Sequence, residues 1–124
     1  MIRPWREIAD FYDRYGDERP SMRALGVLAR QINNGVLASG LFAWTSMNDL
    51  CVVQTKATYP YYGPVLRLSP VGVDEVELRY EDSDDRTKQW HRIVAADQAF
   101  TRLVKFLDEL RWFPSAVLKT MHTE

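Results

Sequence analysis

The run EVELRYE at residues 75–81 alternates strictly between charged side chains and apolar or aromatic ones. Because successive side chains of a β-strand point to opposite faces, Val76, Leu78 and Tyr80 share one face and their charged neighbours share the other. This pattern is typical of an antiparallel sheet that buries one face and leaves the other in water. It predicts a chain that covers a single side of its sheet.

The neighbouring segments supply the other strands. The run VLRLS at 65–69 alternates in the same way, with Leu66 and Leu68 opposite Arg67, and the turn VGVDE separates it from the first run. Two short β-rich runs, LFAWTSM and LCVVQT, flank Asn48-Asp49 and predict a hairpin. The polar turn DSDDRT leads into KQWHRIV, which predicts a fifth strand.

Three segments place apolar side chains at the helical period of 3.6 residues. The first covers residues 4–16, and the second runs from Ser21, a predicted N-cap, to the NNG of residues 33–35. The third begins at Asp97, a predicted N-cap or first-turn acid, and ends before Pro114. Their apolar positions are Trp5, Ile8, Tyr12 and Tyr15, then Met22, Leu25, Leu28, Ala29 and Ile32, then Phe100, Leu103, Val104, Leu107 and Leu110.

These elements predict one α+β domain over residues 1–124. It has about five antiparallel strands, with an N-terminal helix pair and a C-terminal helix packed on one face of the sheet. A chain of 124 residues is long enough to bury roughly two thirds of its unfolded surface in one core. Residues 115–124 are predicted to be a short extra turn or a frayed tail.

Charge and composition indicate which kinds of partner and which cellular compartment to expect. The 16 basic and 17 acidic residues give a net charge of −1, which gives no reason to expect a nucleic-acid partner. No apolar run approaches the roughly 20 residues that span a membrane. A single cysteine, Cys51, excludes an internal disulfide, and the charged N-terminal segment lacks the apolar core of a signal peptide. The predicted location is the cytoplasm.

The residues offer no catalytic or metal-binding constellation. His91 is the one histidine inside the predicted body, and a metal site needs several ligands, so we predict neither a metal nor another cofactor. Cys51, His91 and Asp49 together would make a nucleophile, a base and an orienting acid. However, Cys51 lies within an apolar run and Asp49 in a turn, where both residue types have ordinary structural uses. We predict no catalytic residue.

The first functional hypothesis is therefore a non-enzymatic protein-binding module of the immunity or inhibitor type. Acid clusters steer association with basic partners, and arginine and aromatic residues gather at interface centres. The predicted contact residues are Arg79, Asp82, Asp84, Asp85 and His91.

The stretch YPYYGP at residues 59–64 carries the alternative hypothesis. Pro60 and Pro64 each fix φ and remove a hydrogen-bond donor, so the stretch predicts a stiff crossover between two strands. Aromatic walls with a few polar groups are also what small-molecule pockets use. The alternative is a ligand-binding or enzymatic pocket lined by Tyr59, Tyr61, Tyr62, Arg79 and His91.

Segments between residues 44 and 113 resemble a group of short, uncharacterised bacterial proteins with no assigned activity. They are WTSMNDLCVVQ, YPYYGPVLRLSP, ELRYED, QWHRIV and RWF. The resemblance implies a bacterial cytosolic protein and transfers no site residue. Many small bacterial α+β proteins of this kind are immunity proteins or other binding partners, so a protein partner is expected. A homodimer formed through an edge strand or the aromatic helix end is a further alternative.

Overall fold

A computed structural model describes residues 1–17, 19–82 and 84–119. The helices are α1 (Trp5–Tyr15), α2 (Pro20–Asn33), α3 (Ala99–Glu109) and α4 (Ser115–Lys119). The strands are β1 (Phe42–Ser46), β2 (Asp49–Val53), β3 (Val65–Val71), β4 (Glu75–Glu81) and β5 (Trp90–Ala95). Short 3₁₀ turns cover Val36–Ser39, Arg86–Lys88 and Ala96–Gln98.

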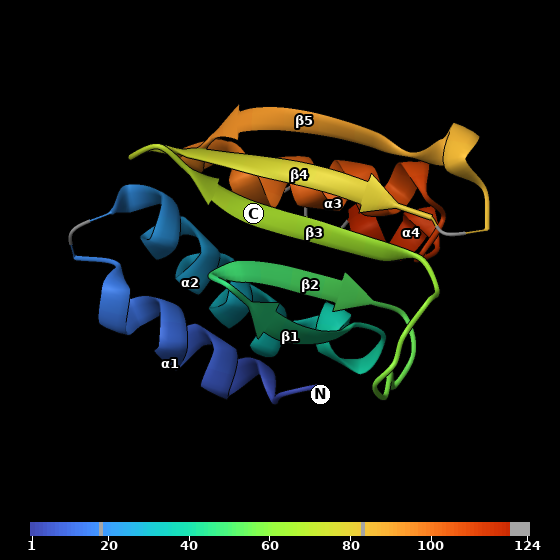
Figure 1. Ribbon diagram of the computed structural model, residues 1–124, viewed down its shortest axis with the longest axis horizontal. Coiled ribbons are helices and arrows are strands. Elements are labelled where there is room, and N and C mark those ends of the chain that lie inside the picture. Colours follow the sequence, from blue (N-terminus) through green and yellow to red (C-terminus); the bar gives the residue numbers. More distant parts are fainter. Residues whose placement is uncertain (18, 83, 120–124) are drawn as a thin grey trace.

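The five strands form one antiparallel sheet in the order β1-β2-β3-β4-β5, so each strand pairs with its neighbour in sequence. The helices lie on one side of this sheet (Figure 1), where α2 contacts β3 and β4 and α3 contacts β5. The predicted fold class is confirmed: an α+β arrangement with a helix pair before the sheet and a helix after it.

The alternation in β3 and β4 decides which side is buried. Leu66, Leu68, Val76 and Leu78 have no exposed surface and join the helices in the main core. Burying one such side chain fully contributes roughly 2 kcal/mol, so reversing the face of a strand by a one-residue slip would cost several of these contributions. The sequence pattern therefore fixes the orientation of the central strands.

The helix pair is held by close packing and by one shared cation. A Cβ added at Gly26 on α2 would lie 2.7 Å from a carboxylate oxygen of Asp13 on α1, so a larger residue there would displace the carboxylate that binds Arg30. Arg30 on α2 reaches across to Asp10, at 3.1 Å, and to Asp13. Its hydrogen bond with Asp13 raises the pKa of Arg30 above its ordinary value.

Two predicted helix caps are wrong. Helix α2 begins at Pro20 rather than after Ser21, and the Ser21 hydroxyl is buried without a hydrogen-bond partner in the described structure. Proline suits the first helical turn because its missing N–H has no partner there. Asp97 lies in a 3₁₀ turn, and α3 begins two residues later at Ala99.

Three predicted boundaries also shift. The tight turn of the first hairpin is Met47-Asn48, with φ of 52° and 74°, so Asp49 opens β2. Strand β5 begins at Trp90 because the preceding residues form a 3₁₀ turn. Helix α3 stops at Glu109, since Arg111 adopts φ 59° and ends the helical path before Pro114. Residues 115–119 form α4, and the rest of the predicted tail lies outside the described residues.

Candidate functional site

The side of the sheet that is turned away from the helices forms an open face. The strand register aligns one residue from each strand on it, from β1 to β5. This cross-strand row is Trp44, Cys51, Arg67, Arg79 and His91. The open face therefore carries cationic and aromatic side chains on a rigid sheet.

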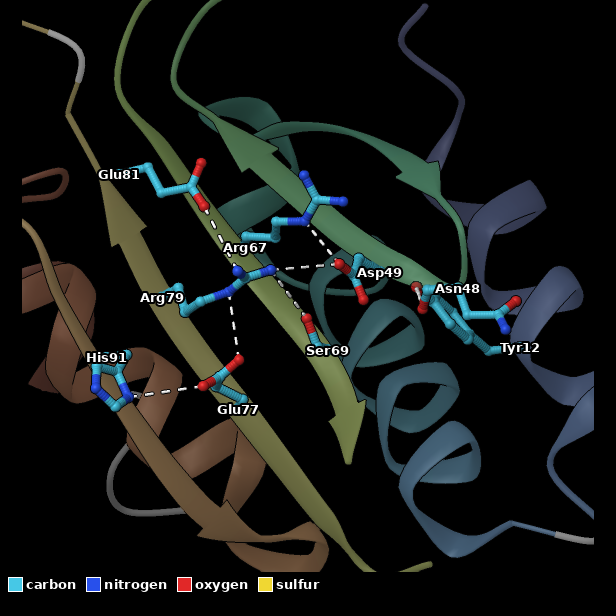
Figure 2. A network of polar contacts seen from close by, with 9 residues as sticks. All are labelled: Tyr12, Asn48, Asp49, Arg67, Ser69, Glu77, Arg79, Glu81 and His91. Carbon is cyan, nitrogen blue, oxygen red and sulfur yellow. Dashed lines mark hydrogen bonds and ion pairs between the residues drawn. The ribbon is translucent and has the colours of Figure 1, made fainter. Parts of the chain in front are cut away.

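Asp49 lies between the two arginines of this row (Figure 2). Its Oδ2 accepts a hydrogen bond from Nε of Arg67 at 2.6 Å and lies 3.5 Å from Nη2 of Arg79. The Asp49 side chain is only 16% exposed, so both contacts are partly shielded from water. One carboxylate thus holds two guanidinium groups.

Two further carboxylates complete the network around Arg79. Glu77 lies 3.3 Å from Nε of Arg79, and Glu81 lies 3.9 Å from Nη1. The other carboxylate oxygen of Glu77 lies 3.6 Å from Nδ1 of His91 (Figure 2). Nε of Arg79 is buried and within ion-pair distance of Glu77, but it is not aligned for a hydrogen bond.

Arg67 and Arg79 are directly opposite each other in the β3–β4 register. Like charges in this position destabilise a sheet unless other groups compensate them. Burial works against the charge of Arg67, but its hydrogen bond to Asp49 and nearby negative groups bring its pKa above the ordinary value. The acids therefore compensate the charges of two adjacent cations and hold their side chains in place.

The core positions Asp49 through the turn before it. The hydroxyl of Tyr12, on α1, donates a hydrogen bond to the carbonyl oxygen of Asn48 at 2.9 Å (Figure 2). Asn48 is the second residue of the left-handed turn that starts β2. The buried ring of Tyr12 thereby connects the helix layer to the carboxylate of the open face.

Among the predicted contact residues, the structure brings Arg79 and His91 together as cross-strand neighbours. Both line a shallow hollow of about 440 Å³ at the β4–β5 edge. The complete lining of this hollow is Glu77, Arg79, Tyr80, Glu81, Gln89, Trp90 and His91.

The structure does not gather the three tyrosines at this hollow. Tyr59 and Tyr62 are 86% and 76% exposed, whereas Tyr61 is partly buried. The ring of Tyr61 meets Trp44 edge-on at 6.0 Å, and its hydroxyl donates to the carbonyl of Pro64 at 2.7 Å. The crossover thus packs beside β1, and none of the three tyrosines lines the hollow that contains Arg79 and His91.

Asp82 and Asp85, two acids of the run at the end of β4, accept hydrogen bonds from groups of their own turn. Asp82 is 6% exposed, and its carboxylate accepts hydrogen bonds from the backbone N–H groups of Asp84 and Asp85 and from the Tyr80 hydroxyl. Asp85 accepts from the backbone and side chain of Thr87, and these bonds lower the pKa of its carboxyl. Asp84 is the exposed member of the three.

Asp82→Ala is expected to lower the free energy of unfolding by about 2 kcal/mol, because two partly buried N–H groups and the buried Tyr80 hydroxyl would lose a charged acceptor. Urea denaturation followed by circular dichroism measures the change. Asp84→Ala is the matched control and should stay within about 0.5 kcal/mol of the parent, as surface substitutions do. Equal losses in the two variants would contradict the structural role of Asp82.

Cys51 and His91 cannot form a catalytic pair in this arrangement. They lie on β2 and β5, three strand spacings apart, or roughly 14 Å. Cys51 is 2% exposed, and burial raises the pKa of its thiol from 9.0 to about 11. A buried neutral thiol is a poor nucleophile.

The raised pKa of Cys51 predicts a pH dependence. The folded state favours the neutral thiol, so this contribution to stability is complete below pH 9 and is lost as the pH rises through about 11. At pH 8 the native protein should react with a thiol reagent at least about a hundredfold more slowly than the urea-unfolded chain. Rapid labelling of the native protein at pH 8 would contradict this burial.

Sequence reasoning missed the central role of Asp49 and Arg67. The alternation in VLRLS places Arg67 on the wet face, whereas the sequence pattern allows Asp49 to be an orienting acid for His91 and favours a turn residue, with no link to the arginines. One signal in the sequence pointed to this site: Arg67 and Arg79 occupy outward positions on two predicted neighbouring strands. Two like charges on neighbouring strands repel each other, so a nearby acid is expected to compensate them.

No family model, curated protein or solved structure matches this chain. The resemblance to short bacterial proteins stays a prediction. Within the described ranges, no helix is long and apolar enough to cross a membrane. In the same part of the chain, no three histidine, cysteine or acidic side chains are grouped so that they could hold a metal ion.

Proposed function

We propose that this chain is a non-enzymatic protein-binding module of the inhibitor or immunity type, and that the open face is its binding surface. The observation that carries the proposal is the pair of opposed arginines, Arg67 and Arg79, held by ion pairs around Asp49 on the side of the sheet without helices. Fixing these side chains in advance reduces the entropy that binding would otherwise cost.

The composition of the open face supports a protein partner. Arginine and tryptophan are the residues most enriched at the energetic centres of interfaces, and the row places Trp44 on the same face as both arginines. The mixed charges, with Glu77 and Glu81 beside Arg79, suit a partner that also presents both signs of charge. The separation of Cys51 from His91 supports a role without catalysis.

The test is a pull-down from extract of the native cells with the tagged full chain, at low and at moderate salt. A partner should be retained in roughly equal amounts, and Arg79→Glu should reduce its recovery about tenfold or more. Arg6→Glu is the matched control, because Arg6 is exposed on α1 and makes no ion pair with the described residues.

Circular dichroism and urea denaturation of both variants establish that each is folded before the comparison is made. Recovery of no stoichiometric partner at either salt concentration would overturn the proposal. Equal recovery with the two charge-reversed variants would place binding elsewhere on the molecule and would overturn the assignment to the open face.

A further inference from the structure

Strand β5 leaves one margin of the sheet without a neighbour among the described residues (Figure 1). The opposite margin is partly covered, because the backbone N–H of Arg3 donates to the carbonyl of Ala43 in β1 at 2.8 Å. Exposed edges of this kind accept an additional strand through their free backbone groups.

The register identifies which backbone groups of β5 are free. The N–H of Ala96 donates to the carbonyl of Asp74 at 2.7 Å, and these two residues continue the β4–β5 register. Along an antiparallel ladder, hydrogen-bonded pairs alternate with pairs that are not hydrogen-bonded. The backbone N–H and C=O groups of the even-numbered residues of β5 therefore point toward β4. The N–H and C=O groups of His91 and Ile93 and the N–H of Ala95 therefore point away from the sheet. The carbonyl of Ala95 is not free, because Ala95 caps the 3₁₀ turn Ala96–Gln98 and its carbonyl accepts the first hydrogen bond of that turn.

One of these carbonyls already has a local partner. Nη1 of Arg92 donates to the carbonyl oxygen of His91 at 2.8 Å, which agrees with an outward direction of that group. The guanidinium of Arg92 also lies 5.9 Å from the centre of the Trp90 ring. Ile93, at the middle of this edge, is 51% exposed.

A second arginine, Arg102 on α3, belongs to the same cluster of aromatic contacts as Arg92. The Trp90 ring packs against Phe106 of α3 at 4.4 Å, and the guanidinium of Arg102 lies 5.8 Å from the centre of the Phe106 ring. Arg92 lies two residues beyond Trp90, an advance of about 6.6 Å along β5. Arg102 lies four residues before Phe106, an advance of about 6 Å along α3. Since α3 runs back along β5, Arg92 and Arg102 reach the same level of the edge.

Neither arginine has an acidic partner in the part of the chain that the structure describes. The register places Leu78 opposite Arg92, and the positions three and four residues from Arg102 along α3 contain no acid. Nε of Arg102 is buried without a hydrogen-bond partner. Elsewhere on the sheet the arginines are paired, as Arg67 and Arg79 are, so two unpaired neighbours mark a place for an external anion.

We propose that this edge binds an extended acidic segment of a partner protein. The segment adds to the sheet beside β5 by pairing with the backbone of His91, Ile93 and Ala95. Its carboxylates, on the face turned toward α3, bind Arg92 and Arg102. The free backbone groups favour a polypeptide strand over a nucleic acid, because phosphates would use the arginines and leave these groups unpaired.

A second copy of this chain does not fit the same edge. Pairing of β5 with β5 of another copy would bring two Arg92 side chains near each other, and β5 contains no acid to compensate them. The proposal uses side chains other than those of the open face and does not depend on the function proposed above.

The test uses the isotope-labelled full chain and a short capped peptide in which threonine and glutamate alternate. Titration followed by amide chemical shifts should perturb the residues of β5, with the largest changes at His91, Ile93 and Ala95. The Arg92→Glu/Arg102→Glu double variant should bind this peptide at least about tenfold more weakly and should gain affinity for a threonine–lysine peptide.

Ile93→Pro separates backbone pairing from charge attraction. Because the Ile93 N–H points outward, proline removes a donor needed by the added strand and leaves the β4–β5 ladder intact. This variant should remain folded by urea denaturation and lose at least about tenfold in affinity for the acidic peptide. An acidic peptide in which alternate amides are N-methylated should not bind the parent chain, because it lacks the N–H donors that pair with β5.

Three results would overturn the proposal: no shifts in β5 at millimolar acidic peptide, equal binding of the threonine–lysine peptide to the parent chain, or unchanged affinity in Ile93→Pro. A single-stranded oligonucleotide that shifts Arg92 and Arg102 while the peptide does not would make the edge a phosphate site. Dimerisation of the free chain that is abolished by Ile93→Pro would assign the edge to a second copy.

Discussion

Tyr12→Ala is expected to lower the free energy of unfolding by about 4 kcal/mol, within the range measured for deleting large buried aromatic rings. The Tyr12 side chain has no exposed surface, and its hydroxyl donates to the carbonyl of Asn48 at 2.9 Å. Alanine would leave a cavity in the core beside α1 and would leave that carbonyl without its donor. Urea denaturation at neutral pH measures the loss.

Tyr12→Phe is the control that separates the ring from the hydroxyl. It keeps the packed volume and should cost about 1 kcal/mol, the contribution of one hydrogen bond. Tyr15→Ala on the same helix should cost less than Tyr12→Ala by about 2 kcal/mol or more, since Tyr15 is 54% exposed. A loss in Tyr12→Phe as large as in Tyr12→Ala would contradict packing as the main contribution of this residue.

The sequence was sufficient for the architecture because the decisive signal was local. Alternation in β3 and β4 assigned Arg67 and Arg79 to the wet face, and the structure agrees. Turn geometry was harder to predict. Met47 adopts φ 52°, and methionine carries no preference for the left-handed region, so nothing in the sequence placed the turn at Met47-Asn48.

The site was less predictable because it depends on strand register. Alternation gives the face of each side chain but not its partner on the next strand. Asp49 meets Arg67 and Arg79 across separations of 18 and 30 residues, and only the completed ladder brings them together. Asp82 is the opposite case. The sequence suggested that its carboxylate contacts a partner, whereas in the structure it accepts hydrogen bonds from the N–H groups of its own turn.

Asp49→Ala should lower the free energy of unfolding by about 2 kcal/mol, after allowance for the partial exposure of its partners. The loss has two parts: the missing hydrogen bond to Arg67 and the uncompensated repulsion between Arg67 and Arg79. The second part is screened by salt, so the loss should be smaller in 1 M sodium chloride than at low ionic strength. Urea denaturation at both salt concentrations makes the comparison.

A double-mutant cycle with Arg67→Met isolates the interaction. Once Arg67 is neutral, Arg79 no longer faces a like charge, so removing Asp49 should cost less than in the parent by about 1 kcal/mol. Tyr12→Phe, which acts on the turn rather than on the arginines, should show no comparable change with salt. Additive losses in the cycle, with no salt dependence, would mean that Asp49 acts only through its turn. The arginines of the open face would then lack the compensation on which its proposed use as a binding surface rests.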